Sequence, residues 1–423
     1  MRNLILTGLV IALTASSAMS GESLSPERLL PGAGTKDAYR PAAAACPSTP
    51  STSSGQVKDI FFVVWQAGRM QEGDIVGCRL DRSGKVLDAA PFAVSAAKDD
   101  QEEPRVAFGN SVFLVVWQDL RNEKDYDLYA ARVSADGKVL DAEGILVSGG
   151  ANNQCRPSVA FDGGNFVVAW QDLRDGKAYR IYGARVSAEG KVLDQEGVLL
   201  SGAKEFHQTV AVASAGDGRT LVAWGSTNRG AGGIPEGIFV REGKATGLAI
   251  PPCSSRDVPK GLAKSVYAMK GLYPALAAGK DSFLLAWRNY LPAGRGGNGT
   301  RACCQVVSAD GKRGELLTFT GKAQVAIDPQ VVWDGVAYVA AWGDICETRK
   351  KGQNAQPGVF VNRLGKDGKP LCPAERASGS WESPAQRPAL ASDGAGTTLV
   401  TYEKHPATAD VPIKIAFRLL RAK

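Results

Sequence analysis

Residues 113–121 read FLVVWQDLR and residues 166–174 read FVVAWQDLR, an apolar run that ends in tryptophan and is followed by a short polar stretch. The same position recurs along the chain, with tyrosine in the last copy: Trp65, Trp117, Trp170, Trp224, Trp287, Trp342 and Tyr402. Successive copies are 52 to 63 residues apart. Repeats of about fifty residues that are rich in short strands are typical of β-propellers. The sequence therefore predicts an all-β protein, a seven-bladed β-propeller.

The third copy shows the internal pattern of one blade. Four segments rich in β-branched and aromatic residues alternate with turns of Gly, Asp, Asn and Ser, at 156–161, 166–170, 179–186 and 192–200. Such a pattern predicts four antiparallel strands joined by tight turns. A blade cannot bury both of its apolar faces alone, so we expect the tryptophan of each second strand to pack between neighbouring blades.

The two ends of the chain predict how the ring closes. After Tyr402 the last copy offers a third strand, residues 414–420, and then the chain stops. The missing fourth strand is expected at the other end, where Glu27-Arg28-Leu29-Leu30 is similar to residues 196–200. An N-terminal strand that completes the last blade would also cover an edge that otherwise invites aggregation.

Residues 1–20 have the features of a cleavable signal peptide. Arg2 precedes an apolar run of twelve residues, and Ala18-Met19-Ser20 offers small residues for cleavage. The run is too short to span a bilayer, which needs about 20 residues. We expect a secreted or periplasmic protein without a membrane span, in which residues 21–423 form a single monomeric propeller domain.

Charge and cysteine content narrow the possible partners. The formal net charge is +7, but charges of both signs alternate along the repeats, which indicates a solvated surface and not nucleic-acid binding. Eight cysteines in an oxidising compartment are expected to form disulfides. Cys346 with Cys372, and Cys253 with Cys303 or Cys304, are plausible pairs, although the spacing leaves the connectivity open. No metal or other cofactor is expected.

Two stretches carry a resemblance to known proteins. Residues 115–121 (VVWQDLR) and 128–133 (LYAARV), followed by Asp136-Gly137, resemble a repeat of exported bacterial β-propeller proteins of mostly uncharacterised role. The resemblance covers residues 28–420 and is closest in the first three copies; a later copy has Gln305 where arginine is usual. It implies the propeller fold and export, and it transfers no catalytic residue.

A proline begins the first strand of most copies, and the residue before it is expected to line the mouth of the central channel. In the fourth copy Gln208 stands in place of the proline. Around the ring these mouth residues are Arg40, Glu103, Arg156, His207, Tyr273, Asp328 and Arg387. They share a face with the long loops 118–127, 225–236, 288–300 and 343–358, and variable loops on a rigid scaffold often carry function.

Three arginines at one mouth suit an acidic ligand, because a guanidinium binds a carboxylate through two hydrogen bonds. We expect a non-catalytic binding module for an acidic glycan or a protein partner, unless the mouth charges only neutralise one another or hold water. The alternative is a polysaccharide lyase acting on uronate-containing glycans by β-elimination. In it, His207 or Tyr273 would remove the proton next to the carboxylate while Arg156 stabilises the developing charge.

The Trp-Gln-Asp-x-Arg run allows two interpretations. Asp119 and Asp172 could act as acid and base, or Asp119 could join Asp125 and Asp127 around calcium. The same letters occur in two adjacent copies, whereas a catalytic group normally occurs once per ring. We therefore predict that Asp119 with Arg121, and Asp172 with Arg174, form structural clamps.

Overall fold

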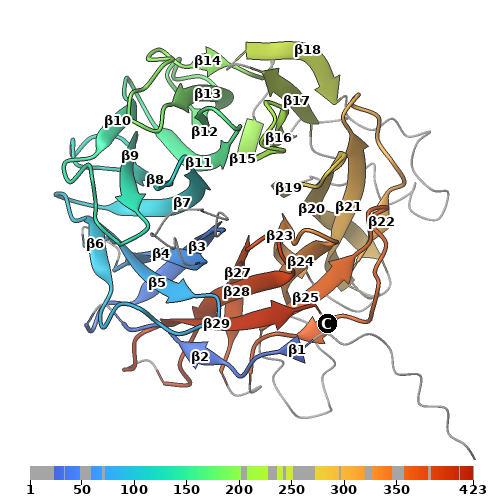
Figure 1. The fold of residues 1–423 in the computed structure, drawn as a ribbon. Coiled ribbons are helices and arrows are strands. Elements are labelled where there is room, and N and C mark those ends of the chain that lie inside the picture. The colour runs from blue at the N-terminus through green and yellow to red at the C-terminus, as the bar shows by residue number, and fades with distance from the viewer. Residues whose placement is uncertain are drawn as a thin grey trace, which may run out of the picture.

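The computed structural model describes residues 23–32, 34–47, 59–68, 72–201, 207–226, 236–241, 244–250, 272–294, 297–319, 326–344, 357–379, 383–408 and 410–422. In these ranges the chain forms seven antiparallel sheets, which are arranged as blades around a central axis (Figure 1). The seven-bladed β-propeller is confirmed. The predictions for residues 1–20, Cys253 and Cys346 lie outside the described residues.

The blades follow one another along the chain, and each runs outward from its first strand. The first blade comprises β3 (Ala38–Cys46), β4 (Ile60–Ala67), β5 (Asp74–Asp81) and β6 (Phe92–Ser95). The second comprises β7 (Gln101–Gly109), β8 (Val112–Asp119), β9 (Asp127–Ser134) and β10 (Ile145–Ser148). The third comprises β11 (Gln154–Phe161), β12 (Phe166–Asp172), β13 (Arg180–Val186) and β14 (Val198–Leu199).

The remaining four blades repeat this order. The fourth comprises β15 (His207–Ser214), β16 (Thr220–Ser226), β17 (Glu236–Arg241) and β18 (Lys244–Ile250). The fifth comprises β19 (Leu272–Ala278), β20 (Ser282–Gly294), β21 (Gly297–Ser308) and β22 (Leu317–Thr318). The sixth has β23 (Ala326–Trp333), β24 (Tyr338–Asp344), β25 (Gly358–Leu364) and β26 (Glu375–Arg376). The seventh has β27 (Ala385–Ser392), β28 (Thr397–Lys404) and β29 (Lys414–Arg421).

The N-terminal segment closes the ring, as predicted, but through two short strands instead of one. Both β1 (Ser23–Leu24) and β2 (Arg28–Leu29) pair antiparallel with β29 at the edge of the seventh blade. Between them, the Glu27 carboxylate accepts hydrogen bonds from the Tyr402 hydroxyl at 2.6 Å and from the Gly379 amide at 2.9 Å, and it forms an ion pair with Lys404. These contacts join the start of the chain to the sixth and seventh blades.

The repeated aromatic residues fill the spaces between blades. Six tryptophans and Tyr402 are all buried, as predicted from their spacing. Trp117, for example, belongs to one apolar cluster with Phe62 and Val64 of the preceding blade. Burial of such side chains against the next blade explains why a single blade is not an independent unit.

Two segments differ from expectation. In the third blade only β14 pairs as the fourth strand, because a turn interrupts the predicted strand 192–200: Gly197 has φ of 66° and its amide donates to the Asp194 carbonyl at 2.9 Å. In the fifth blade the predicted loop 288–300 is instead the far end of the β20–β21 hairpin, whose ladder continues to Gly294 and Gly297. In the part of the chain that the structure describes, no helix is both long and apolar enough to cross a membrane.

Candidate functional site at the channel mouth

All seven innermost strands carry a β-bulge at the same place, next to the central axis. The ladder to the second strand slips by one residue near the start of β3, β7, β11, β15, β19, β23 and β27. At each slip one non-glycine residue adopts a left-handed backbone, with φ between 47° and 58°: Arg40, Glu103, Arg156, Thr209, Tyr273, Asp328 and Arg387. We call these seven residues the collar. Left-handed φ is costly for such side chains, so its presence in every blade requires a compensating contact.

Part of that compensation is a set of hydrogen bonds between neighbouring blades. The bulge turns the backbone N–H of the collar residue sideways. The amide of Arg40 donates to the Glu403 carboxylate at 2.8 Å, that of Arg156 to Gln118 Oε1 at 3.1 Å, and that of Tyr273 to Thr209 Oγ1 at 3.1 Å. These hydrogen bonds hold the collar backbone to the neighbouring blade at three of its seven positions.

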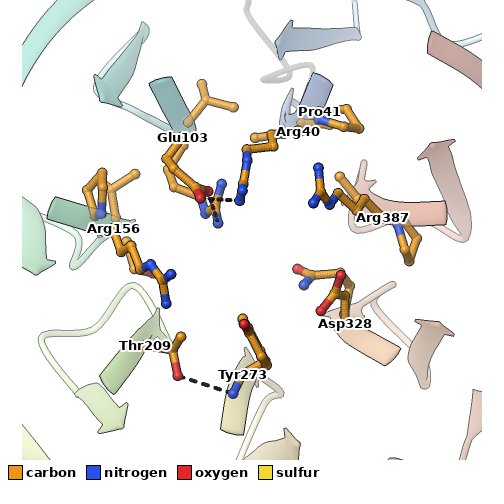
Figure 2. Close-up of a pocket in the computed structure, with 18 of the residues that line it drawn as sticks. Arg40, Pro41, Glu103, Arg156, Thr209, Tyr273, Asp328 and Arg387 are labelled. Atoms are coloured by element: carbon orange, nitrogen blue, oxygen red, sulfur yellow. Dashed lines mark hydrogen bonds and ion pairs between the residues drawn. The ribbon is translucent and has the colours of Figure 1, made fainter. Parts of the chain in front are cut away.

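The collar side chains surround a cavity of about 310 Å³ at the centre of the ring (Figure 2). Its wall continues down the inner strands through small and apolar residues such as Pro157 and Val210. The charged groups among the described lining residues are four arginines and two acids: Arg40, Arg105, Arg156, Arg387, Glu103 and Asp328. The mouth is therefore a ring of charge above a less polar shaft, with arginine in excess.

Six of the seven predicted mouth residues lie in the collar, and the fourth position differs. Thr209 occupies it, because the bulge of β15 falls between Gln208 and Val210. His207 begins the same strand two residues earlier, paired with Ser226, and its side chain lies outside the described residues. The sequence predicts this position two residues too early because the fourth copy lacks the proline that marks the others. The distance to the following tryptophan was the better signal: it is 14 residues in four blades and 15 from Thr209 to Trp224.

Three of the seven collar residues, Arg40, Glu103 and Arg387, are held in ion pairs. Arg40 pairs with Glu103, whose second oxygen lies 3.6 Å from Arg105 Nη2. Arg387 pairs with the buried Glu403 at 3.2 Å. Burial tends to lower the pKa of Arg387, but Glu403 outweighs this and raises it. For Arg105, burial lowers the pKa.

The other four collar residues are Arg156, Thr209, Tyr273 and Asp328. The Arg156 side chain is exposed and points toward the centre of the ring, where no described residue forms an ion pair with it (Figure 2). Tyr273 is 38% exposed, which is unusual for a large ring beside a channel. Asp328 follows in the next blade; burial raises its pKa, against the opposing effect of Arg387 and Arg288.

Glu403 and His405 form a polar cluster behind the collar that the sequence did not reveal. Glu403 Oε2 lies 3.2 Å from His405 Nε2, which also contacts Gln386 Nε2 at 2.8 Å. Burial alone would raise the pKa of Glu403, but His405, Arg387 and the Arg40 amide lower it. The one signal was the position itself: Glu403 follows the seventh aromatic residue, where Gln66, Gln118 and Gln171 stand in the first three copies.

The predicted structural clamps are present in the second and third blades. Asp119 is fully buried and accepts hydrogen bonds from Trp117 Nε1 at 2.7 Å and from Arg121 Nη2 at 2.7 Å. Asp172 makes the same contacts with Trp170 at 2.8 Å and with Arg174 at 2.6 Å. The arginines then lie over tyrosine rings, with Arg121 Cζ 3.9 Å from the centre of Tyr129. Carboxylates held in this way are structural.

The acidic loop beyond this clamp gathers no cation site. Asn122 Nδ2 bridges Asp125 and Asp127 at 2.9 and 3.0 Å. Across the described ranges, no three His, Cys, Asp or Glu side chains are grouped so as to hold a metal ion.

The ring of blades and its collar define a closed seven-bladed β-propeller with a central cavity. Comparison of the sequence with models of protein families and with curated proteins finds no match. Among solved structures, the chain is similar in fold to the polysaccharide lyase Uly1, with a TM-score of 0.51 and 10% identity over 90% of both chains.

Two further solved structures align over most of the chain. One is a protein of unknown function from Dyadobacter fermentans, with a TM-score of 0.48 and 9% identity over 95% of this chain and 100% of that one. The other is an α-L-arabinanase from Penicillium chrysogenum, with a TM-score of 0.48 and 9% identity over 93% and 98%. The structural neighbours thus include glycan-processing enzymes.

Proposed function

We propose that this protein is an exported, non-catalytic binding module whose collar recognises an acidic glycan. The observation that carries the proposal is the collar itself: strained positions in seven blades present three arginines and two acids around one cavity, which a fourth arginine, Arg105, also lines. Left-handed non-glycine residues cluster at functional sites, where the surrounding structure holds them. The ion pairs formed by Arg40, Arg105 and Arg387 leave one guanidinium available to a ligand.

A specific observation also favours a second candidate, the uronate lyase. Arg156 and Tyr273 both line the cavity, and a tyrosine can serve as base while an arginine stabilises the developing charge. The likeness in fold to the lyase Uly1 is compatible with this reaction.

One experiment separates the two candidates. The purified protein is incubated with a panel of uronate polymers, and ultraviolet absorbance is followed for the unsaturated product of β-elimination, while binding to the same polymers is measured in parallel. We expect binding without product. Formation of product that is lost in Tyr273→Phe would replace the binding proposal by the lyase, and absence of both binding and product would refute both.

A further inference from the structure

The collar divides into two arcs that differ in how their charges are compensated. In the paired arc, formed by the seventh, first and second blades, Arg387 is held by Glu403, and Arg40 is held by Glu103. In the open arc, formed by the third to sixth blades, Arg156, Thr209, Tyr273 and Asp328 lie in succession around the ring (Figure 2). The positive charge that a ligand can use is therefore on one side of the mouth.

The open arc offers three kinds of contact within one small space. The guanidinium of Arg156 is exposed, and the planar fork of an arginine matches a carboxylate. The Tyr273 ring is accessible and has a hydroxyl that makes no hydrogen bond with a described residue, so it can cover an apolar sugar face and still bond to a sugar hydroxyl. Asp328, next in the ring, adds an acceptor for hydroxyl groups.

The shape of the cavity limits how a ligand can enter. Inner strands surround it on all sides, and its lining includes residues of all seven: β3, β7, β11, β15, β19, β23 and β27. Its volume of about 310 Å³ is at the lower end of ligand pockets, which range from about 300 to 1,000 Å³. An internal unit of a polymer would have to enter with the chain on both of its sides, whereas an end unit can enter alone.

We infer that the open arc binds the terminal uronate of an acidic glycan end-on, with the sugar carboxylate on Arg156, the ring against Tyr273 and the rest of the chain leaving through the mouth. This inference deepens the proposed function and rests on it. It names the recognised unit, a single carboxylated sugar at a chain end. It also assigns the paired arc to holding the collar in shape.

The contact between Arg156 and the sugar carboxylate is tested by substituting the arginine and, in parallel, removing the charge of the ligand. Calorimetric titration compares glucuronic and galacturonic acids and their short oligomers with the corresponding methyl esters. We expect the wild type to bind the acids about tenfold more tightly than the esters. This ratio corresponds to roughly 1.4 kcal/mol for one charge-assisted contact. In Arg156→Gln this preference should vanish, and in Arg156→Lys it should be partly kept.

Arg219→Gln is the matched control, because Arg219 lies in the turn between β15 and β16, at the opposite end of its strand from the collar, and pairs with the exposed Asp217. It should leave binding unchanged. Unaltered thermal unfolding of each variant shows that the fold is intact. If Arg156→Gln still separates acid from ester, the carboxylate binds elsewhere and the inference is overturned, while the proposed function stands.

End-on entry is tested by chain length. Oligomers of one to six units should reach a constant molar affinity after the first one or two, and long polymers should bind more weakly per unit mass because they have fewer ends. An affinity that keeps rising with length would show that the chain lies across the face, which contradicts the inference but not the proposed function. If no acid on the panel binds, both are refuted.

Discussion

The carboxylate of Asp119 connects a repeated sequence signal to the stability of a blade. It is fully buried and accepts from the Trp117 indole and from Arg121. In Asp119→Ala the buried indole N–H loses its partner, which costs about 1–3 kcal/mol. Urea unfolding should show this loss. Asp217→Ala, which breaks an exposed pair, should change the free energy of unfolding by less than about 0.5 kcal/mol. Equal effects of the two substitutions would contradict the clamp.

At the scale of the strands, Glu27 joins the closing segment to the ring. Burial tends to raise its pKa, but hydrogen bonds from Lys404, Tyr402 and Gly379 lower it. A carboxyl with a lowered pKa stabilises the fold above its unfolded value of about 4.3, and this contribution is lost as the pH falls through the folded value.

We therefore expect Glu27→Gln to lower the unfolding free energy by about 1–3 kcal/mol at neutral pH, because hydrogen bonds to a charged acceptor are lost. Thermal unfolding between pH 3 and 7 should show the difference between variant and wild type shrinking as the pH falls. Glu315→Gln, at an exposed pair with Lys369, is the control and should show little effect. A difference that is constant with pH would mean that the Glu27 charge does not hold the closing strands.

The sequence correctly predicts the elements that follow from a physical requirement common to every blade. Each blade must bury an aromatic residue against its neighbour, so the intervals between Trp117, Trp170 and the rest predict the blade count. The bulge that aims each collar side chain depends on strand pairing, which the sequence does not show. Proline marks its position in most copies, but that marker is missing in the fourth, so the sequence predicts His207 where the structure has Thr209. The contacts of Glu403 with Arg387 and with the Arg40 amide join different strands and could not be predicted.

At the scale of the whole molecule, closure of the ring makes the candidate site possible. The seven bulges place one side chain from each blade at an equivalent position near the axis. Because the residue type differs from blade to blade, the collar has a paired arc and an open arc. The proposed recognition thus lies at one end of the channel, while the described connections on the opposite face include short turns such as residues 134–138.

The most direct test of the collar as a binding site is hydrogen–deuterium exchange with and without a short uronate oligomer at saturating concentration. We predict slower exchange at the mouth-side ends of the inner strands, above all at the amides of Arg156 and Tyr273, and little change in the outer strands β10 and β14. Protection confined to the outer strands or to the turns of the opposite face, with the collar amides unchanged, would contradict the account.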